Sequence, residues 1–573
     1  MCRPYAWASS LLVLTTCVAP TATPAVKPGA LEGATPCLSI GAWNDLHGQI
    51  GPDEPVIDTG PLPAGGVIAL ADAISDLRAT ADTVVLLDAG DLFTGPLAST
   101  FAEGAPIIDA YRVLGVDAVA VGNHEFDFGP VGYDEVVAKD GITDAAGGRG
   151  PRGALMARMA SSTFPFLSAN VHSSRGATPA WPHFAASVHV RRGGFDVGVV
   201  GYTTRETPST TARPNVADLD FSTRAAESVA AEIHALRASG AAPIILLAHA
   251  SLDGALPQTL DDSVDPRGDV PKGEIATLVA ALGVDRPDVI VAGHRHAWML
   301  GRVAGIPIVS SDQHGVGLAR IRFCRDHSGP TLRSIERRAV LAASPPRSSL
   351  GRAVALAVAP WELAVKAKGD ALVTTLPRAC PTQAVGGTAG AEQVARAIAA
   401  HASDAAPAPS GAPVIGITNT GALRAPLKAG RMRYADLFSA FPFETTIASC
   451  GTTRGDVARL IRNALADPSA WKHFPLALAG AKATIARAVD GTLSLVGLEV
   501  DGEPRGATDK SPVWLALPDF VLDGGDGLMA GVSCVPAVRS ATRVRDAWRE
   551  ILAREPNGCE GQPRNIVIHD ATK

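Results

Sequence analysis

The stretch from residue 38 to residue 325 alternates short apolar runs with longer segments of helical periodicity. The apolar runs end in small or polar residues: SIGAWND, TVVLLDAGD, VDAVAVGNH, FDVGVVGYT, PIILLAHAS and PDVIVAGHRH. The helical segments include IALADAISDLRAT and STRAAESVAAEIHALRAS. This alternation predicts an α/β domain in which helices and sheets pack in layers. In such folds the functional site forms beyond the carboxyl ends of the strands, so we expect the polar residues after these strands to converge.

The chain has 573 residues, which is too long for a single hydrophobic core. We predict a first domain over 37–328, a connector over 329–368 and a second domain over 369–573. In the connector, ASPPRSS breaks regular structure, and LGRAVALAVAPWELAVKA reads as a helix that Pro360 interrupts. The second domain is predicted to be mixed α/β, with helices near 391–402 and 453–466 and strands at PVIGITN, TIARAV and VWLALP.

Composition excludes some classes of protein. The chain is 46% hydrophobic and 19% charged, which is typical of a globular protein and not of a disordered one. Its net charge of −6 gives no support to a nucleic-acid polymer as partner, because binding a phosphate backbone needs a basic face. Nothing in the sequence implies a protein partner.

Residues 1–36 are predicted to be an export signal followed by a linker. Arg3 is a short basic start, and WASSLLVLTTCVA is an apolar run too short to span a bilayer stably. Cleavage near Ala22 or Ala25 fits this pattern. The alternative is a lipid anchor at Cys17, because LTTC loosely resembles a lipoprotein signal. We therefore expect an exported protein that is periplasmic, at the cell surface or extracellular.

The cysteines outside the export signal are even in number and widely spaced. In an exported protein this favours disulfides, and the absence of a CxxC pair argues against a zinc knuckle. The sequence alone does not determine the pairing. We expect a first pair between Cys37 and Cys324, because these positions bracket the first domain. The full set is Cys37, Cys324, Cys380, Cys450, Cys534 and Cys559.

Polar groups that could bind a metal or act in catalysis follow the predicted strands of the first domain. The spacings DxH and HxH put alternate side chains on one face of an extended segment, so both can reach one centre. Mixed carboxylate, amide and imidazole ligands suit Mn²⁺, Zn²⁺, Fe or Co²⁺ better than Ca²⁺ or Mg²⁺. A single histidine or aspartate at such a position is usually structural, but the ordered set is not. The set is Asp45, His47, Asp91, Asn123, His124, His249, His294 and His296.

The motifs NDLHG, LLDAGD, GNHEFDFG, LAH and GHRH, in this order, resemble the calcineurin-like metallophosphoesterases. The most similar branch is the secreted 5′-nucleotidase family, which also includes UDP-sugar hydrolases and 2′,3′-cyclic-nucleotide phosphodiesterases. The resemblance covers nearly the whole mature chain. It implies an N-terminal four-layer α/β sandwich and a smaller, mixed α/β C-terminal domain that binds the nucleotide. No metal ligand of the family is missing, although Arg295 stands where Thr or Ser is commoner.

The resemblance implies two divalent metal ions, which would be Mn, Zn, Co or Fe. One site would use Asp45, His47, Asp91 and His296, and the other would use Asp91, Asn123, His249 and His294. Two such ions offset phosphate charge and make water a nucleophile near neutral pH, so no phosphoenzyme is expected.

The same resemblance gives roles to the residues that follow Asn123. His124 would stabilise charge in the transition state or leaving group, and Asp127 would orient it. For Glu125 we expect a structural role, as a salt bridge or a cap.

Three stretches of the second domain match the family's nucleoside site: NTGALRAPL, FPFET and LPDFVLDGGDGL. Phe443 and Phe520 would sandwich the base, Asn419 and Asp526 would contact base or ribose, and Arg424 would hold phosphate or ribose oxygens. The chain departs from the family at GGTAGAEQVARAIAAHASD, which has no clear equivalent of a further substrate arginine. Glu392 and Arg396 could be remnants of that feature, and the departure bears on substrate choice.

We therefore expect an enzyme, a two-metal phosphoric ester hydrolase of the 5′-nucleotidase type that releases nucleoside and phosphate. The alternatives are a UDP-sugar or 2′,3′-cyclic-nucleotide phosphodiesterase with 3′-nucleotidase activity, or a thiosulfohydrolase-like enzyme on the same fold. The paired Phe443 and Phe520 favour a nucleotide, because a small inorganic group has no ring to stack. A surface binding protein with a vestigial site is disfavoured by the intact ligands. The sequence does not decide the native metal, the preferred nucleotide or the oligomeric state.

Overall fold

The computed structural model describes residues 35–52, 62–130, 150–221, 224–253, 272–382, 388–466, 475–489, 491–505, 509–557, 559 and 565–570. Nearly all of the predicted export signal and linker, including Cys17, lies outside these residues. Within the described residues, no helix has the length and apolar character needed to cross a membrane.

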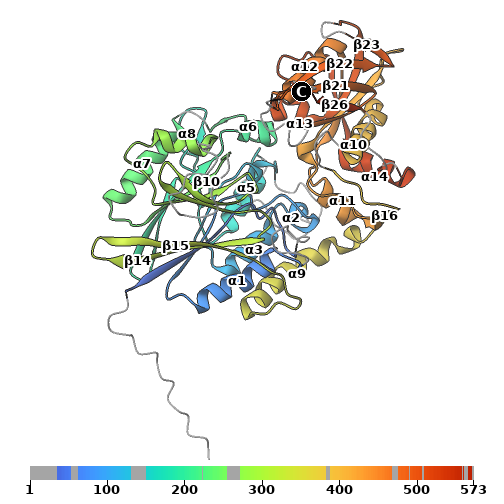
Figure 1. Cartoon of the computed structure of the whole chain (residues 1–573). Coiled ribbons are helices and arrows are strands. Elements are labelled where there is room, and N and C mark those ends of the chain that lie inside the picture. The colour runs from blue at the N-terminus through green and yellow to red at the C-terminus, as the bar shows by residue number, and fades with distance from the viewer. Residues whose placement is uncertain are drawn as a thin grey trace, which may run out of the picture.

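The first part of the chain contains two large sheets (Figure 1). The first sheet has seven strands in the order β15-β14-β1-β2-β3-β4-β6: β1 (Cys37–Trp43), β2 (Val84–Asp88), β3 (Ala118–Ala120), β4 (Phe166–Leu167), β6 (Phe184–Ala185), β14 (Gly317–Asp326) and β15 (Gly329–Ala339). The second sheet has six strands in the order β12-β13-β11-β10-β8-β7: β7 (Ser187–Arg192), β8 (Phe195–Thr203), β10 (Ile244–His249), β11 (Val289–Gly293), β12 (Trp298–Val303) and β13 (Ile306–Ser311). A short pair joins β5 (His172–Ser173) to β9 (Leu219–Asp220).

The two sheets face each other and helices cover their outer faces. Ile40, Leu87, Val199 and Leu247 belong to one apolar cluster between the sheets. A second cluster joins the first sheet to α1 and α3, and a third joins the second sheet to α7 and α8. The four-layer α/β sandwich is therefore confirmed. The helices of this part are α1 (Val67–Ala79), α2 (Leu97–Phe101), α3 (Ala105–Leu114), η1 (His124–Phe126), α5 (Gly153–Ser161), α6 (Thr207–Thr210), η2 (Arg213–Asn215), α7 (Ala225–Ala238) and α8 (Glu274–Ala281).

The central strands are parallel, so their carboxyl ends meet at one edge. In the first sheet β1 pairs with β2, and β2 with β3. In the second sheet β10 lies between β8 and β11. These strands are almost wholly apolar because each is buried on both faces, which is typical of parallel sheets. All six strands predicted from the apolar runs are present.

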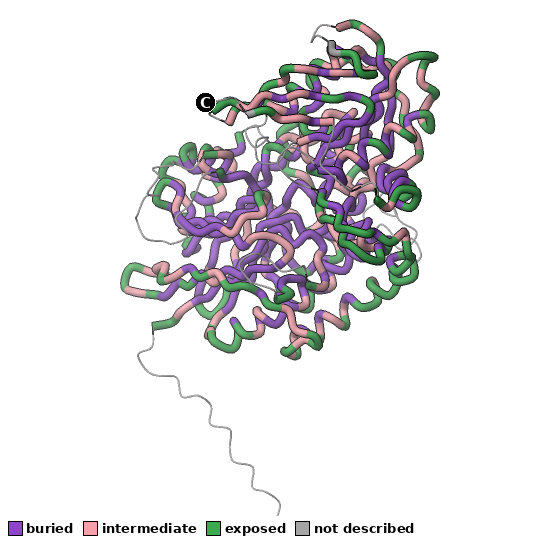
Figure 2. Tube along the Cα trace, turned by 45° about the vertical axis from the view of Figure 1, so that its right-hand side comes forward, coloured by how far each residue is buried: buried purple, intermediate pink, exposed green. Residues whose placement is uncertain are grey.

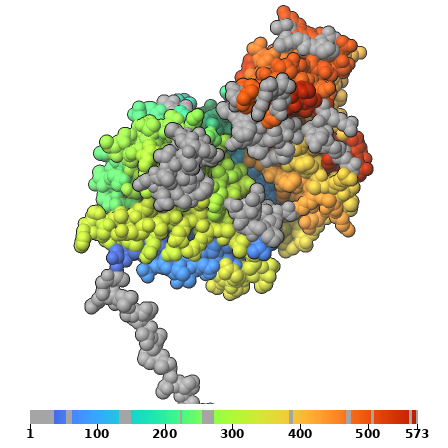
Figure 3. All heavy atoms as spheres, in the orientation of Figure 1, coloured from blue at the N-terminus to red at the C-terminus, as the bar shows by residue number. Residues whose placement is uncertain are grey.

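The second domain is also mixed α/β, and Figure 3 shows it beside one end of the sandwich. Its sheets run in the orders β20-β17-β24-β19-β25 and β23-β22-β21-β26, with a separate pair of β16 and β18. The strands are β16 (Leu372–Leu376), β17 (Val414–Asn419), β18 (Gly430–Arg433), β19 (Thr446–Thr453), β20 (Leu476–Ala479), β21 (Ala481–Arg487), β22 (Leu493–Val500), β23 (Glu503–Arg505), β24 (Pro512–Pro518), β25 (Ala537–Arg543) and β26 (Ile566–Asp570). The helices are α10 (Ala389–Ala400), η3 (Ala402–Asp404), η4 (Thr420–Ala422), α11 (Tyr434–Ala440), α12 (Arg454–Leu465), α13 (Asp519–Leu522), η5 (Gly525–Gly527) and α14 (Val544–Arg554).

One prediction about the connector is wrong. Helix α9 (Ser349–Gly369) runs unbroken through Pro360. A proline inside a helix removes one hydrogen bond and crowds the preceding turn. Packing offsets this cost, because α9 lies against α1, α2 and α3 and buries Val354, Val358 and Val365. Figure 2 shows the resulting mixture of buried and exposed positions along α9. The helix also contacts α11, so it connects the sandwich to the second domain. The predicted domain boundaries stay predictions.

Three disulfides connect distant parts of the chain. Cys37 bonds to Cys324, as expected, because the antiparallel pairing of β1 with β14 places these residues directly opposite each other. In the second domain Cys380 bonds to Cys559, and the remaining pair is Cys450 with Cys534.

Removing the first disulfide should destabilise the sandwich. The Cys37–Cys324 bond closes a loop with a sequence separation of 287 residues. We expect the double variant Cys37→Ser, Cys324→Ser to lose about 2–5 kcal/mol of unfolding free energy. Urea denaturation of both proteins without reductant measures this loss, and adding reductant to both proteins should remove the difference between them. Coincident urea midpoints of oxidised wild type and variant would contradict it.

Candidate active site

The predicted ligands of the first domain lie at the carboxyl ends of five parallel strands. Asp45 and His47 follow β1, and Asp91 follows β2. Asn123 follows β3, where it precedes η1. His249 is the last residue of β10, and the pair His294 and His296 follows β11. The two sheets meet at this edge, so residues that are far apart in sequence come together as predicted.

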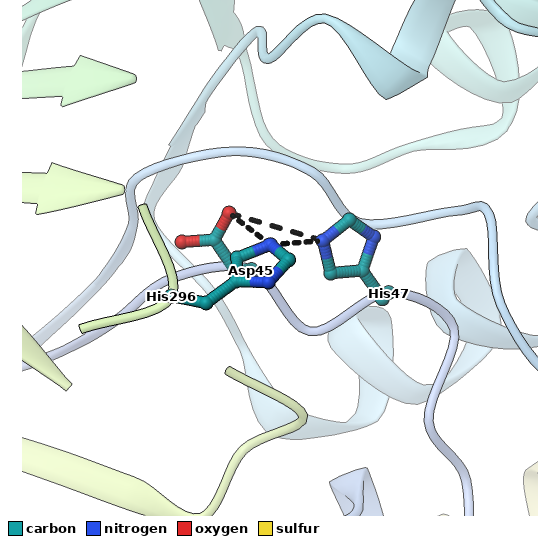
Figure 4. A group of neighbouring side chains, drawn as sticks. All are labelled: Asp45, His47 and His296. Atoms are coloured by element: carbon teal, nitrogen blue, oxygen red, sulfur yellow. Dashed lines mark hydrogen bonds and ion pairs between the residues drawn. The ribbon is translucent and has the colours of Figure 1, made fainter. Parts of the chain in front are cut away.

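The first group consists of Asp45, His47 and His296. One potential ligand atom from each lies within 4.8 Å of the others. The Nε2 atoms of His47 and His296 are 2.8 Å apart. Oδ1 of Asp45 lies 3.9 Å from Nε2 of His47 and 3.5 Å from Nε2 of His296. Figure 4 shows the three side chains pointing toward a common centre.

The second group consists of Asp91, His249 and His294, whose potential ligand atoms also lie within 4.8 Å of one another. Oδ2 of Asp91 is 3.0 Å from Nε2 of His249. Asn123 joins this group, because its Oδ1 lies 3.2 Å from Nε2 of His249 and 3.0 Å from Nδ1 of His294.

Asp91 lies between the two groups. Its Oδ2 is 3.8 Å from Nε2 of His47 in the first group and 3.0 Å from Nε2 of His249 in the second. Burial alone would raise the pKa of Asp91, but the nearby His249 and His124 outweigh burial and hold that pKa well below its usual range. The carboxylate is therefore charged and within reach of both groups.

The backbone is strained where it presents these side chains. The angle φ is positive at five potential ligands, a conformation that non-glycine residues rarely adopt. Such strain concentrates at functional sites, because surrounding structure must hold it in place. The five angles are 51° at Asp45, 47° at His47, 60° at Asp91, 79° at His294 and 47° at His296.

Two of the histidines are oriented by backbone carbonyls. Nδ1 of His47 lies 3.1 Å from the carbonyl of Thr94, and Nδ1 of His249 lies 2.8 Å from the carbonyl of Ala89. A proton on Nδ1 makes each of these hydrogen bonds and leaves the Nε2 lone pair for a metal. Burial and the neighbouring His296 lower the pKa of His47 well below its usual value, which keeps the ring neutral.

Both groups fit divalent metal ions. Each combines carboxylate oxygen with imidazole nitrogen in a buried site, the donor set that suits Mn²⁺, Zn²⁺, Fe or Co²⁺. The identity of the ions stays a prediction.

Glu125 is fully buried and has the structural role that we expected. Its carboxylate accepts hydrogen bonds from the backbone N–H groups of Asp91 at 3.0 Å, Leu92 at 2.6 Å and Gly122 at 2.7 Å. It thus binds the loop after β2 to the loop after β3. Burial and the charge of Asp91 raise the pKa of Glu125 to about 7.

His124 and Asp127 form a pair at the edge of the metal groups. Nδ1 of His124 lies 2.6 Å from Oδ2 of Asp127. The hydroxyls of Thr94 and Thr211 also donate to Asp127, at 2.8 and 2.9 Å. Burial alone would lower the pKa of His124, but the carboxylates of Asp127 and Asp91 raise it overall. The ring is held with Nε2 directed away from Asp127.

A pocket of about 420 Å³ lies between the two domains. From the first domain it is lined by Asp91, Asn123, His124, Asp127, His294 and His296. All the residues predicted to bind substrate in the second domain line the same pocket: Asn419, Arg424, Phe443, Phe520 and Asp526. Asp45, His47 and His249 lie behind this lining and are buried.

Arg424 connects the domains within the pocket. Its Nη2 lies 3.0 Å from Nε2 of His124, and its guanidinium carbon lies 5.2 Å from the centre of the Phe443 ring. Nδ2 of Asn419 donates to Oδ2 of Asp526 at 2.8 Å. Oδ1 of Asn419 is buried and, among the described residues, accepts no hydrogen bond. The pocket therefore combines an aromatic surface, a guanidinium and hydrogen-bond acceptors.

Glu392 and Arg396, from the segment that departs from the family pattern, lie elsewhere. Arg396 pairs with Glu555 at 2.7 Å, and Glu392 accepts a hydrogen bond from the backbone of Asn565 at 2.9 Å. Neither lines the pocket. Arg295 pairs with Asp253 at 2.7 Å.

Sequence reasoning missed the residues that follow β8. Oε2 of Glu206 lies 3.2 Å from Nε2 of His294, while Thr211 and Arg213 line the pocket. A signal was present, because FDVGVVGYT was predicted as a strand and TRETPSTTAR follows it directly. The expectation that functional residues follow the carboxyl ends of the strands applied to this strand as well.

Comparisons with known proteins agree with this architecture. Residues 38–298 match a family model for calcineurin-like phosphoesterase, and residues 370–532 match one for the 5′-nucleotidase C-terminal domain. A snake venom 5′-nucleotidase from Gloydius brevicauda is 30% identical over 203 residues, which are 35% of this chain and 30% of that protein. The 5′-nucleotidase of Rattus norvegicus is 31% identical over 175 residues, 30% of this chain and 27% of the relative. These alignments thus span about a third or less of the curated relatives.

Solved structures share the fold over nearly the whole chain. A 5′-nucleotidase precursor from Thermus thermophilus superimposes with a TM-score of 0.72 at 19% identity, covering 94% of this chain and 100% of that one. A sulfate thiohydrolase, SoxB, from Thermus thermophilus gives a TM-score of 0.66 at 15% identity, covering 93% and 96%. The two family matches follow each other along the chain in the order of the sandwich and the second domain: this chain combines a calcineurin-like phosphoesterase domain with a 5′-nucleotidase C-terminal domain.

Proposed function

We propose that this protein is a metal-dependent hydrolase that removes phosphate from nucleotides outside the cytoplasm and releases nucleoside. One observation carries the proposal. A single pocket is lined by ligands from the second metal group, by His296 of the first group, and by the aromatic residues Phe443 and Phe520. A substrate that has both a phosphate and a flat ring would use both ends of that pocket.

The first group and Asp91 would hold one ion, and the second group with Asn123 would hold the other. Bound divalent ions supply positive charge that offsets the charge of the phosphate and lowers the pKa of water. Asp91 would serve both sites, since its carboxylate is close to both groups. Asn123 adds an oxygen without adding charge.

His124 and Arg424 would act on the phosphate ester from the open side. Asp127 holds His124 by Nδ1, so Nε2 faces the pocket, where Nη2 of Arg424 lies 3.0 Å from it. Protonated at Nε2, the ring can donate a hydrogen bond to charge that develops on the leaving oxygen. The guanidinium of Arg424 lies beside this atom and can hold phosphate oxygens with its fixed pair of donors.

The nucleoside would occupy the second-domain side of the pocket. Stacking on Phe443 and Phe520 tolerates any base, while Asp526 and Oδ1 of Asn419 can accept hydrogen bonds from hydroxyl or amino groups. This aromatic lining favours nucleotides over thiosulfate-like substrates, although the fold itself is shared with a sulfate thiohydrolase. UDP-sugars and cyclic nucleotides remain alternative substrates of the same site.

Three disulfides support the proposed location outside the cytoplasm, because disulfides persist in oxidising compartments. The partner that we propose is a small nucleotide, with no nucleic-acid polymer and no protein partner. Membrane attachment would depend only on lipidation of Cys17.

The deciding experiment is phosphate release by the purified mature protein loaded with Mn²⁺ or Co²⁺. The substrates are AMP, UMP, 3′-AMP, ATP, UDP-glucose, 2′,3′-cyclic AMP and p-nitrophenyl phosphate, with chelator controls and a coupled phosphatase for the diesters. Chelator-sensitive turnover that prefers nucleotides would support the proposal. Turnover of p-nitrophenyl phosphate alone would reject the nucleoside site.

Asp91→Asn should abolish turnover and leave the chain folded. In the wild type, Oδ1 of Asp91 accepts a hydrogen bond from the backbone N–H of His124 at 2.9 Å, and asparagine keeps an oxygen for this bond. The substitution removes the negative charge that both metal groups share. Phosphate release and circular dichroism test the two halves of this expectation. Asp196→Asn is the control, since Asp196 lies outside the pocket. Retention of more than about a tenth of the activity would contradict the two-metal assignment.

Glu125→Gln should weaken metal binding about 10- to 100-fold, because a neutral amide cannot accept the three backbone hydrogen bonds equally well. The dependence of phosphate release on metal concentration measures this change. Glu227→Gln, at an exposed position of α7, is the matched control. An unchanged metal dependence in Glu125→Gln would mean that the two loops hold their positions without this carboxylate.

Phe520→Ala should raise KM for nucleotides about 5- to 150-fold, because each stacked base gains roughly 1–3 kcal/mol. Hydrolysis of p-nitrophenyl phosphate should hardly change. Steady-state kinetics on the two substrates makes the comparison. Equal losses on both would reject the stacking role of this ring.

A further inference from the structure

Arg213 is a second arginine of the pocket, and it comes from the metal-bearing domain. It begins η2, which follows β8 and α6, and its side chain is exposed. Arg424 is engaged by His124 and by the Phe443 ring. Within the part of the chain that the structure describes, the guanidinium of Arg213 makes no hydrogen bond or ion pair. Its donors are thus available to a molecule in the pocket.

The backbone around Arg213 is held on both sides. On one side Thr211 donates its hydroxyl to Asp127 at 2.9 Å. On the other side Nδ2 of Asn215 donates to the carbonyl of Phe126 at 2.8 Å, and Arg152 donates to the carbonyl of Asn215 at 2.6 Å. The side chain therefore projects from a fixed turn.

Arg213 lies near Phe520 in the pocket. Nη1 of Arg213 lies 3.0 Å from the position that a Cβ atom on Gly524 would occupy. The ring of Phe520 lies 2.4 Å from the position that a Cβ atom on Gly525 would occupy. The guanidinium and the ring thus flank two successive glycines of one turn. Helix α6, just before Arg213, packs against η5 in the same region. Arg424 lies beside His124, and Arg213 lies near the ring of Phe520, which would stack on the base.

A guanidinium only donates hydrogen bonds, so it discriminates between bases by their acceptors. A 6-oxopurine presents two acceptors on one edge, O6 and N7, which match the paired donors of arginine. Adenine has an amino donor at position 6 instead. We propose that Arg213 donates hydrogen bonds to the edge of the base and makes the enzyme prefer 6-oxopurine nucleotides over adenine nucleotides. This proposal rests on the function proposed above.

Inosine monophosphate and AMP form the sharpest test, because they differ only at position 6 and the adjoining ring nitrogen. With metal-loaded full-length mature protein, we expect kcat/KM for inosine monophosphate to exceed that for AMP by about 5- to 150-fold. Arg213→Ala should bring this ratio close to one, and Arg213→Lys should restore it only in part, because lysine has no paired donors. Arg191→Ala, an exposed arginine outside the pocket, should keep the wild-type ratio.

Binding of inosine and adenosine by calorimetry repeats the test without the phosphate and should show the same Arg213-dependent preference. A wild-type ratio near one, or equal losses on both nucleotides in Arg213→Ala, would overturn the proposal and leave the nucleotidase function standing. Turnover of p-nitrophenyl phosphate without turnover of any nucleotide would overturn both together.

Discussion

The site depends on a buried carboxylate that reaches histidines from both sheets. Asp91 lies at the end of β2, and its oxygen approaches His47 from the first sheet and His249 from the second. A buried charge without partners is costly, so the carboxylate stays ionised only because positive or metal-binding groups surround it. The two layers must therefore meet at this edge for the site to exist. Glu125 keeps the loop of Asp91 in place through three backbone hydrogen bonds.

The second domain completes a pocket that the sandwich cannot form by itself. Arg424 reaches across the boundary to His124, and the aromatic residues Phe443 and Phe520 line the same cavity. This arrangement separates the tasks. The sandwich provides the Asp and His groups that would hold metal ions, and the second domain provides aromatic side chains on which a ring would stack. Arg213 is an exception, because it belongs to the sandwich and extends toward Phe520 of the second domain.

Much of this could be predicted from the sequence, and the failures have physical causes. The strands and ligands were predicted because apolar runs and the polar residues that end them are local patterns. The break at Pro360 was wrong because propensity does not include the packing of α9 on three helices. Glu206 and Arg213 were missed because each is an ordinary charged residue that belongs to no recognised motif.

The sequence by itself determined the layered fold and the order of the potential metal ligands, since these depend on periodicity and motif order. The tertiary structure decided how Asp91 lies between the two groups, which backbone groups Glu125 binds, and which side chains face each other across the pocket. The reason is distance along the chain. A contact between residues such as His124 and Arg424, 300 positions apart, forms only when two separately folded cores have packed together.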